Sequence, residues 1–172
     1  MSRTLALILV AVLALASSVA IAGAAKQQGT RGPDTINGTG GADSQSGKNG
    51  NDTLYGNGGN DRQSGGPGDD RVYGGPGNDS LVGAEGNDLL SGDAGDDKLS
   101  GGPGADSLLG GAGADRINGG QGPDSIVGGA GNDSIEARDR EVDTISCGSG
   151  RDTVSADRGD RILGGCERVK RG

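Results

Sequence analysis

The nine residues GGPGDDRVY at positions 65–73 decide the fold, because the same pattern recurs along most of the chain. Residues 128–136, with the sequence GGAGNDSIE, are a second clear copy. Between residues 29 and 136 the pattern is present twelve times, always with Asp as the sixth residue and Gly as the first and fourth. Agreement at so many positions is not an accident of glycine content, so the nine-residue period is a real feature of the sequence.

The repeat resembles the nonapeptide of the RTX family, the haemolysin-type calcium-binding repeats, with the pattern Gly-Gly-x-Gly-x-Asp-x-apolar-x. Six loops match every fixed position, and these end at Asp70, Asp79, Asp106, Asp115, Asp124 and Asp133. The resemblance covers residues 29–136 and implies an all-β fold, a right-handed parallel β-roll that binds Ca²⁺ in its turns. We expect about seven coils of two nonapeptides each, followed by a C-terminal cap.

In such a roll, residues 18 apart stack at about 4.8 Å, so the periodic aspartates line two edges. Carboxylates at that spacing repel each other unless a cation lies between them. Two carboxylates and several main-chain carbonyls form an oxygen cage suited to Ca²⁺. Six aspartates on each edge leave five gaps, hence up to ten sites, with the best sites from Asp70 to Asp133. The predicted metal ligands are Asp34, Asp43, Asp52, Asp61, Asp70, Asp79, Asp88, Asp97, Asp106, Asp115, Asp124 and Asp133.

Composition and charge narrow the functional class. Of the 172 residues 30% are apolar and 1% aromatic, so an ordinary hydrophobic core is not available and a cation must help folding. The net charge of −8 disfavours nucleic acid and anionic membranes as partners. The chain has no His, which removes the commonest general base and the imidazole metal sites. Neither His-Glu-x-x-His nor Gly-x-Ser-x-Gly is present, so we expect no enzyme.

Residues 1–24 are typical of a secretory signal peptide. Arg3 supplies the positive charge, residues 5–16 are an unbroken apolar segment, and small residues at 19–24 offer cleavage positions. The alternative is an uncleaved membrane anchor. The general secretory signal differs from the C-terminal export signal of many RTX proteins. We expect a secreted protein without a membrane span after cleavage, and residues 25–28 as a linker before the array.

The eighth residue of each repeat is predicted to point inward. We call the row of side chains that these residues form along the roll the inward rank. It is apolar except for Gln45 and Gln63, which are 18 residues apart and so stack in one sheet. We interpret them as an amide ladder at the N-terminal end, with a ligand site as the alternative. The inward rank comprises Ile36, Gln45, Leu54, Gln63, Val72, Leu81, Leu90, Leu99, Leu108, Ile117, Ile126 and Ile135.

The two outward faces differ. One carries the apolar residues Tyr55, Tyr73, Leu89, Leu109 and Val127. The other carries the basic residues Arg62, Lys98 and Arg116 among serines. The apolar face is either a contact surface for a polymer or ordinary exposed strand side chains.

The period breaks after Glu136, and residues 137–172 read as degenerate repeats and a C-terminal cap. The loop that ends at Asp152 remains a plausible weak site. Cys147 and Cys166 are 19 residues apart, close to one coil, and a secreted chain with two Cys favours a disulfide between them. A free redox pair is the alternative.

Together these observations predict a secreted, monomeric calcium-binding protein whose folding is coupled to extracellular Ca²⁺. The alternative is a cell-surface adhesin or envelope component that uses the roll as a rigid spacer and binds a surface or extracellular polymer.

Overall fold

The computed structural model describes residues 23–172. The signal-peptide prediction for residues 1–24 therefore lies outside the described residues except for its last two. None of the described residues forms a helix long and apolar enough to cross a membrane.

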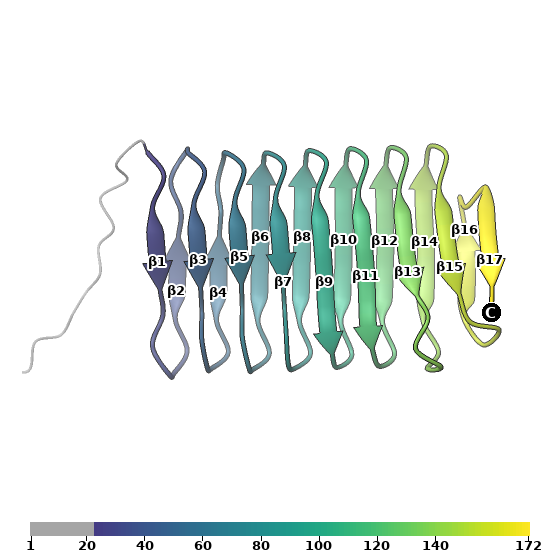
Figure 1. Ribbon diagram of the computed structural model, residues 1–172, viewed down its shortest axis with the longest axis horizontal. Coiled ribbons are helices and arrows are strands. Elements are labelled where there is room, and N and C mark those ends of the chain that lie inside the picture. Colours follow the sequence, from purple (N-terminus) through teal and green to yellow (C-terminus); the bar gives the residue numbers. More distant parts are fainter. Residues whose placement is uncertain (1–22) are drawn as a thin grey trace, which may run out of the picture.

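The chain winds into a parallel β-solenoid with two sheets (Figure 1). The strands follow one another along the long axis, from β1 at one end to β17 at the other (Figure 1). The nine-stranded sheet contains β1 (Lys26–Gln28), β3 (Ser44–Ser46), β5 (Arg62–Ser64), β7 (Ser80–Val82), β9 (Lys98–Pro103), β11 (Arg116–Gln121), β13 (Ser134–Ala137), β15 (Thr153–Ala156) and β17 (Arg168–Arg171). The eight-stranded sheet contains β2 (Thr35–Asn37), β4 (Thr53–Tyr55), β6 (Arg71–Pro76), β8 (Leu89–Ala94), β10 (Ser107–Ala112), β12 (Ser125–Ala130), β14 (Thr144–Ser149) and β16 (Arg161–Gly164).

The register confirms that two nonapeptides make one coil. Val72 pairs with Leu90 in one sheet and Leu81 with Leu99 in the other, each 18 residues apart. Each coil adds one strand to each sheet, so the sheets of nine and eight strands correspond to about eight coils, slightly more than the seven expected. The all-β parallel roll is confirmed.

One local expectation was wrong. Residues 26–28 of the predicted linker, 25–28, form β1, which pairs with β3 in the register Gln27 to Gln45. Strands β6, β8 to β12 and β14 span six residues, because their strand pairing continues into the following turn, as between Gly75 and Asp93.

The inward rank is buried as predicted. Its apolar members are at most 8% exposed, from Ile36 to Ile135. The amide ladder is also confirmed, because Gln63 Nε2 donates to Gln45 Oε1 at 2.7 Å. Gln45 Nε2 in turn donates to Gln27 Oε1 at 2.9 Å, which extends the ladder to β1.

The C-terminal region continues both sheets through β14 to β17. Pairing shifts from 18 to 19 residues at Ser125 and Thr144, since one extra residue enters the intervening turn. The predicted disulfide between Cys147 and Cys166 is present, with Cα atoms 5.2 Å apart. It ties β14 to the segment between β16 and β17.

Candidate metal sites in the turns

Each edge of the roll carries a continuous ladder of aspartates. The Oδ1 oxygen of one Asp accepts the backbone N–H of the Asp one coil earlier, as in Asp70 to Asp52 and Asp79 to Asp61, both at 2.7 Å. The ladder gathers all twelve predicted aspartates into the two predicted rows. The Asp carbonyls also accept hydrogen bonds between coils, for example from Arg71 N–H to Asp52 O at 2.8 Å.

The second carboxylate oxygen, Oδ2, is buried without a hydrogen-bond partner in ten of the twelve predicted residues. A buried oxygen without a donor is costly, particularly when it carries negative charge. Sites of this kind are where a cation is expected, because it replaces the missing donors. The ten residues are Asp52, Asp61, Asp70, Asp79, Asp88, Asp97, Asp106, Asp115, Asp124 and Asp133.

The two fixed glycines of the repeat have different roles. From the third repeat onward the fourth residue has positive φ, as in Gly68 at 135°, a conformation that favours glycine, whereas Gly32 and Gly41 do not have it. The first residue does not have positive φ in any of the twelve repeats. The first residue of the repeat is glycine because a side chain would not fit at this position. A Cβ at Gly65 would overlap the Oδ2 atom of Asp70 in the same repeat. The first glycine therefore makes room for the carboxylate inside the turn.

Burial perturbs these carboxylates strongly. Desolvation raises the pKa of Asp88, Asp97 and Asp124 to about 7, although a backbone hydrogen bond lowers it and neighbouring aspartates raise it further. The same causes raise the pKa of Asp70, Asp79, Asp133 and Asp143 to about 6. Ionised carboxylates in these rows therefore need a positive charge close by.

Asp34 and Asp43 differ from the other predicted ligands. The Oδ2 atom of Asp34 accepts a hydrogen bond from Thr30 Oγ1 at 2.9 Å, and that of Asp43 lies 3.1 Å from Thr39 Oγ1. Both oxygens also accept the backbone N–H of the same Thr, at 2.5 Å. The structure places these two aspartates in the rows but leaves neither Oδ2 without a donor.

The ladders extend beyond the predicted ligands at the C-terminal end. Asp124 N–H donates to Asp143, and Asp143 N–H donates to Asp160. In the other row Asp152 N–H donates to Glu167 Oε2 at 2.7 Å, so a Glu occupies the position of the next Asp. The Oδ2 atom of Asp152 is buried without a partner, like those of the array. Asp143 and Asp160 were not predicted as ligands because the regular Asp spacing ends at Asp133. No sequence signal indicated Glu167.

The turns fit Ca²⁺ by the chemistry of their donors. Within residues 23–172 no three Asp, Glu, His or Cys side chains form a ready-made metal cluster. Main-chain carbonyls would therefore complete each site. The fourth-residue carbonyls, from Gly50 to Gly131, accept none of the hydrogen bonds between turns. Carboxylate and carbonyl oxygens are the hard ligands that Ca²⁺ prefers.

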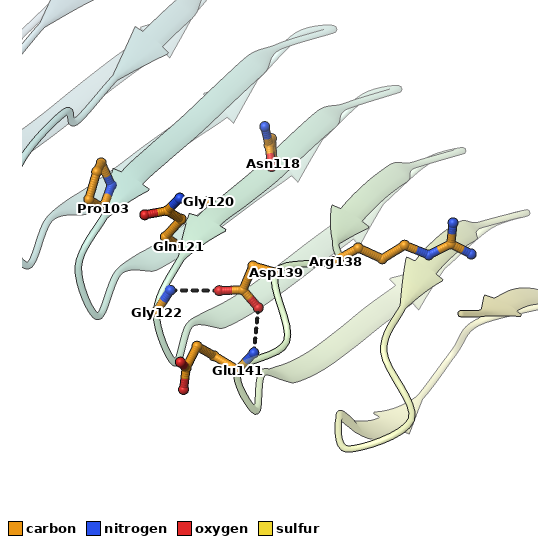
Figure 2. A pocket seen from close by; sticks show the side chains of 8 residues that line it. All are labelled: Pro103, Asn118, Gly120, Gln121, Gly122, Arg138, Asp139 and Glu141. Carbon is orange, nitrogen blue, oxygen red and sulfur yellow. Dashed lines mark hydrogen bonds between the residues drawn. The ribbon is translucent and has the colours of Figure 1, made fainter.

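A surface hollow of about 580 Å³ lies where the period breaks, lined in part by Gln121, Asp139 and Glu141 (Figure 2). The Asp139 carboxylate accepts the N–H groups of Gly122 and Glu141, at 2.7 and 2.8 Å. In a regular turn the N–H of the fourth residue donates to a carbonyl of the next coil, as Gly104 does to Gln121. Asp139 replaces that carbonyl where the extra residue enters, so it holds the irregular turn in place.

The predicted outward residues lie on the expected sheets, but Leu89 is half-buried and pairs with Arg71 and Ser107, outside the rank of Tyr73. Tyr55 and Tyr73 stack with ring centroids 5.1 Å apart on the eight-stranded sheet. Leu109 and Val127 continue this rank, and are 42% and 37% exposed. Arg62 lies on the nine-stranded sheet in the same rank as Lys98 and Arg116.

Comparison with known proteins agrees with the geometry. The family model of the RTX calcium-binding nonapeptide repeat (4 copies) matches segments that together span residues 28–139 and 141–163. A comparison with curated protein sequences finds no match.

Proposed function

Because the chain belongs to the RTX calcium-binding nonapeptide-repeat family, we propose that it is a secreted, non-enzymatic protein whose folding is coupled to extracellular Ca²⁺. The repeats of this family bind Ca²⁺, and the β-roll that they form has a structural role. The finer proposal concerns where the ions bind, what they do for the fold, and where the protein acts.

The buried Oδ2 atoms carry the proposal. Ten successive turns each present one carboxylate oxygen that no protein group satisfies. We assign Ca²⁺ to these turns, with the fourth-residue carbonyls as further ligands. Each Asp would then have two roles, because Oδ1 joins the coils through the ladder and Oδ2 binds the ion. We propose several ions per chain.

Coupling to folding follows from the size of the binding energy. Extracellular Ca²⁺ sites have dissociation constants of about 10⁻⁴–10⁻³ M, which corresponds to about 4–5.5 kcal/mol for each ion. Several such ions equal the net stability of an ordinary domain, about 5–15 kcal/mol. Without ions the ladders would place like charges one coil apart in a poorly solvated turn. The folded roll and the bound ions should therefore form together.

Two features support secretion. Residues 1–24 have the pattern of a signal peptide, and the chain contains the disulfide between Cys147 and Cys166. Disulfides persist in oxidising compartments, where free Ca²⁺ is also at millimolar level. The proposed environment supplies both the oxidant and the ion.

Direct measurement of bound Ca²⁺ tests the proposal. The secreted chain, freed of metal with EGTA, is dialysed to equilibrium against millimolar Ca²⁺, and bound ion is counted by atomic emission. We expect more than two Ca²⁺ per chain and little bound Mg²⁺, since Mg²⁺ requires a smaller, stricter octahedral site. Fewer than two Ca²⁺ per chain would contradict the proposed function.

An envelope role is the second candidate, and the outward rank of exposed Tyr55, Leu109 and Val127 with half-buried Tyr73 favours it. Stacked aromatic rings on a rigid sheet are suited to contact with a surface polymer. The test compares the wild type with a Tyr55→Ser/Tyr73→Ser variant in sedimentation with cell-wall material at saturating Ca²⁺. Equal retention of both proteins would count against this role.

A further inference from the structure

The second residue of the repeat separates the first two turns from the rest. In ten of the twelve repeats this residue has positive φ, whether it is glycine or not. The ten are Lys48, Asn57, Gly66, Gly75, Ala84, Asp93, Gly102, Gly111, Gly120 and Gly129. The two exceptions are Thr30 and Thr39, which stay outside the left-handed region. A β-branched residue rarely adopts positive φ, so threonine favours this backbone conformation. The fourth residues of the same two turns, Gly32 and Gly41, also lack positive φ, so each of these two loops differs from the others as a whole.

The conformation redirects the backbone N–H of the second residue. In a glycine loop the N–H of Gly66 donates to the carbonyl of Gly83 in the next coil, at 2.9 Å. In the threonine loops it turns inward and donates to Oδ2 of the Asp in the same repeat, Asp34 or Asp43. The oxygen that lacks a donor from Asp52 to Asp133 therefore has one in these two turns.

The hydroxyl groups occupy the same space. Thr30 Oγ1 lies 2.9 Å from Asp34 Oδ2 and accepts the N–H of Gly32 at 3.3 Å. Thr39 Oγ1 lies 3.1 Å from Asp43 Oδ2 and accepts the N–H of Gly41 at 3.1 Å. Each hydroxyl thus lies between the carboxylate and the loop backbone.

We infer that Thr30 and Thr39 exclude Ca²⁺ from the first two turns, so that the ion-binding part of the roll begins at Asp52. An ion at Asp34 or Asp43 would have to displace the threonine backbone N–H that donates to Oδ2 and the threonine hydroxyl that lies beside it. The two turns of the first coil thus have the sequence of calcium loops, but their hydrogen bonds are those of a metal-free turn. This coil therefore acts as a terminal cap. This inference rests on the proposed calcium-binding function and states which turns perform it.

Two matched pairs of substitutions test the inference by ion counting. Asp34→Asn/Asp43→Asn should leave the number of bound Ca²⁺ unchanged. Asp70→Asn/Asp79→Asn, the same change in two glycine loops, should lower it. Asparagine keeps an oxygen for the hydrogen bond that Oδ1 accepts from the preceding coil at Asp43, Asp70 and Asp79. A loss of ions from the Asp34/Asp43 variant as large as that from the Asp70/Asp79 variant overturns the inference alone. A wild type that binds fewer than two ions overturns the proposed function and the inference with it.

A gain-of-binding variant gives an independent test. Thr30→Gly/Thr39→Gly restores the residue of the regular loops and should add up to two Ca²⁺ per chain. Thr30→Val/Thr39→Val keeps the β-branch and the inward N–H, and should add none. Added ions in the valine variant, or none in a folded glycine variant, would contradict the role assigned to the threonine backbone.

Discussion

The Oδ1 atom of Asp88 accepts the backbone N–H of Asp70 at 2.8 Å, while Oδ2 of the same carboxylate is buried without a partner. One side chain thus joins two coils and presents a charged oxygen to the interior of the turn. An amide could also accept the hydrogen bond of the ladder, but only a carboxylate provides a second, charged oxygen. This division of roles leads to the first prediction.

Asp88→Asn should weaken Ca²⁺-dependent folding while preserving the ladder. The amide retains an acceptor for Asp70 N–H but loses the charge that binds the ion. We expect the Ca²⁺ concentration at the folding midpoint to rise by at least about twofold, and affinity at the altered site to fall by about tenfold, or about 1.4 kcal/mol. Asp69→Asn is the control, since Asp69 is exposed and its Oδ1 accepts hydrogen bonds from Asn87, from the backbone N–H at 2.8 Å and from Nδ2 at 3.4 Å. Circular dichroism titration measures both midpoints, and equal midpoints would be inconsistent with the site.

The calcium-free chain should become less stable as the pH rises. The pKa of seven buried aspartates lies at about 6 or about 7 in the folded chain, above the ordinary value of 3.8. Between pH 4 and 7 the folded chain therefore binds more protons than the unfolded chain, and unfolding free energy falls as pH increases. In EGTA we expect β structure at pH 5 that is lost by pH 8. Constant or increasing β content over this range would refute the burial of these carboxylates.

Adjacent leucines provide a test of the inward and outward ranks. Leu108 is 1% exposed and Leu109 is 42% exposed. Leu108→Ala should lower the free energy of unfolding by about 2–5 kcal/mol, because it removes buried contacts and leaves a cavity. Leu109→Ala should change it by about 0.5 kcal/mol or less. Chemical denaturation in saturating Ca²⁺ measures both values, and similar losses would mean that the alternation is wrong.

Loss of the disulfide should destabilise the C-terminal coils without removing calcium binding. Cys147 and Cys166 close a segment of 19 residues, for which the expected contribution is about 3 kcal/mol. A Cys147→Ser/Cys166→Ser variant should unfold at lower denaturant and bind the same number of Ca²⁺. The oxidised and reduced wild type provide the matched comparison. Fewer bound ions in the variant would show instead that the bridge supports the metal turns.

Much of the molecule could be predicted because the repeat fixes one geometry and uses it twelve times. The two rows of aspartates, the buried rank around Leu90 and the amide pair of Gln45 and Gln63 all follow from a spacing of 18 residues. The disulfide follows from a spacing of 19 residues, which is close to one coil. Each of these features depends only on which residues stack, and stacking is a property of the period.

Features that depend on backbone conformation within one turn could not be predicted this way. The sequence pattern treats Thr30 and Gly66 as occupants of one variable position, yet their opposite φ decides whether Oδ2 has a donor. Strand β1 lies before the first repeat, where no period indicates it. Glu167 replaces an Asp by reaching further from a shifted backbone position, which no spacing rule indicates.

The central claim is that the roll folds when Ca²⁺ binds the buried carboxylates. Far-UV circular dichroism of the oxidised chain from residue 25 onward, at pH 8, tests it most directly. The sample starts in EGTA and is titrated with Ca²⁺ and, separately, with Mg²⁺. We predict a coil spectrum that changes cooperatively to a β spectrum at millimolar Ca²⁺ and stays coil in Mg²⁺. A β spectrum already complete in EGTA would contradict the claim, because the ladders and the disulfide would then hold the fold without the ion.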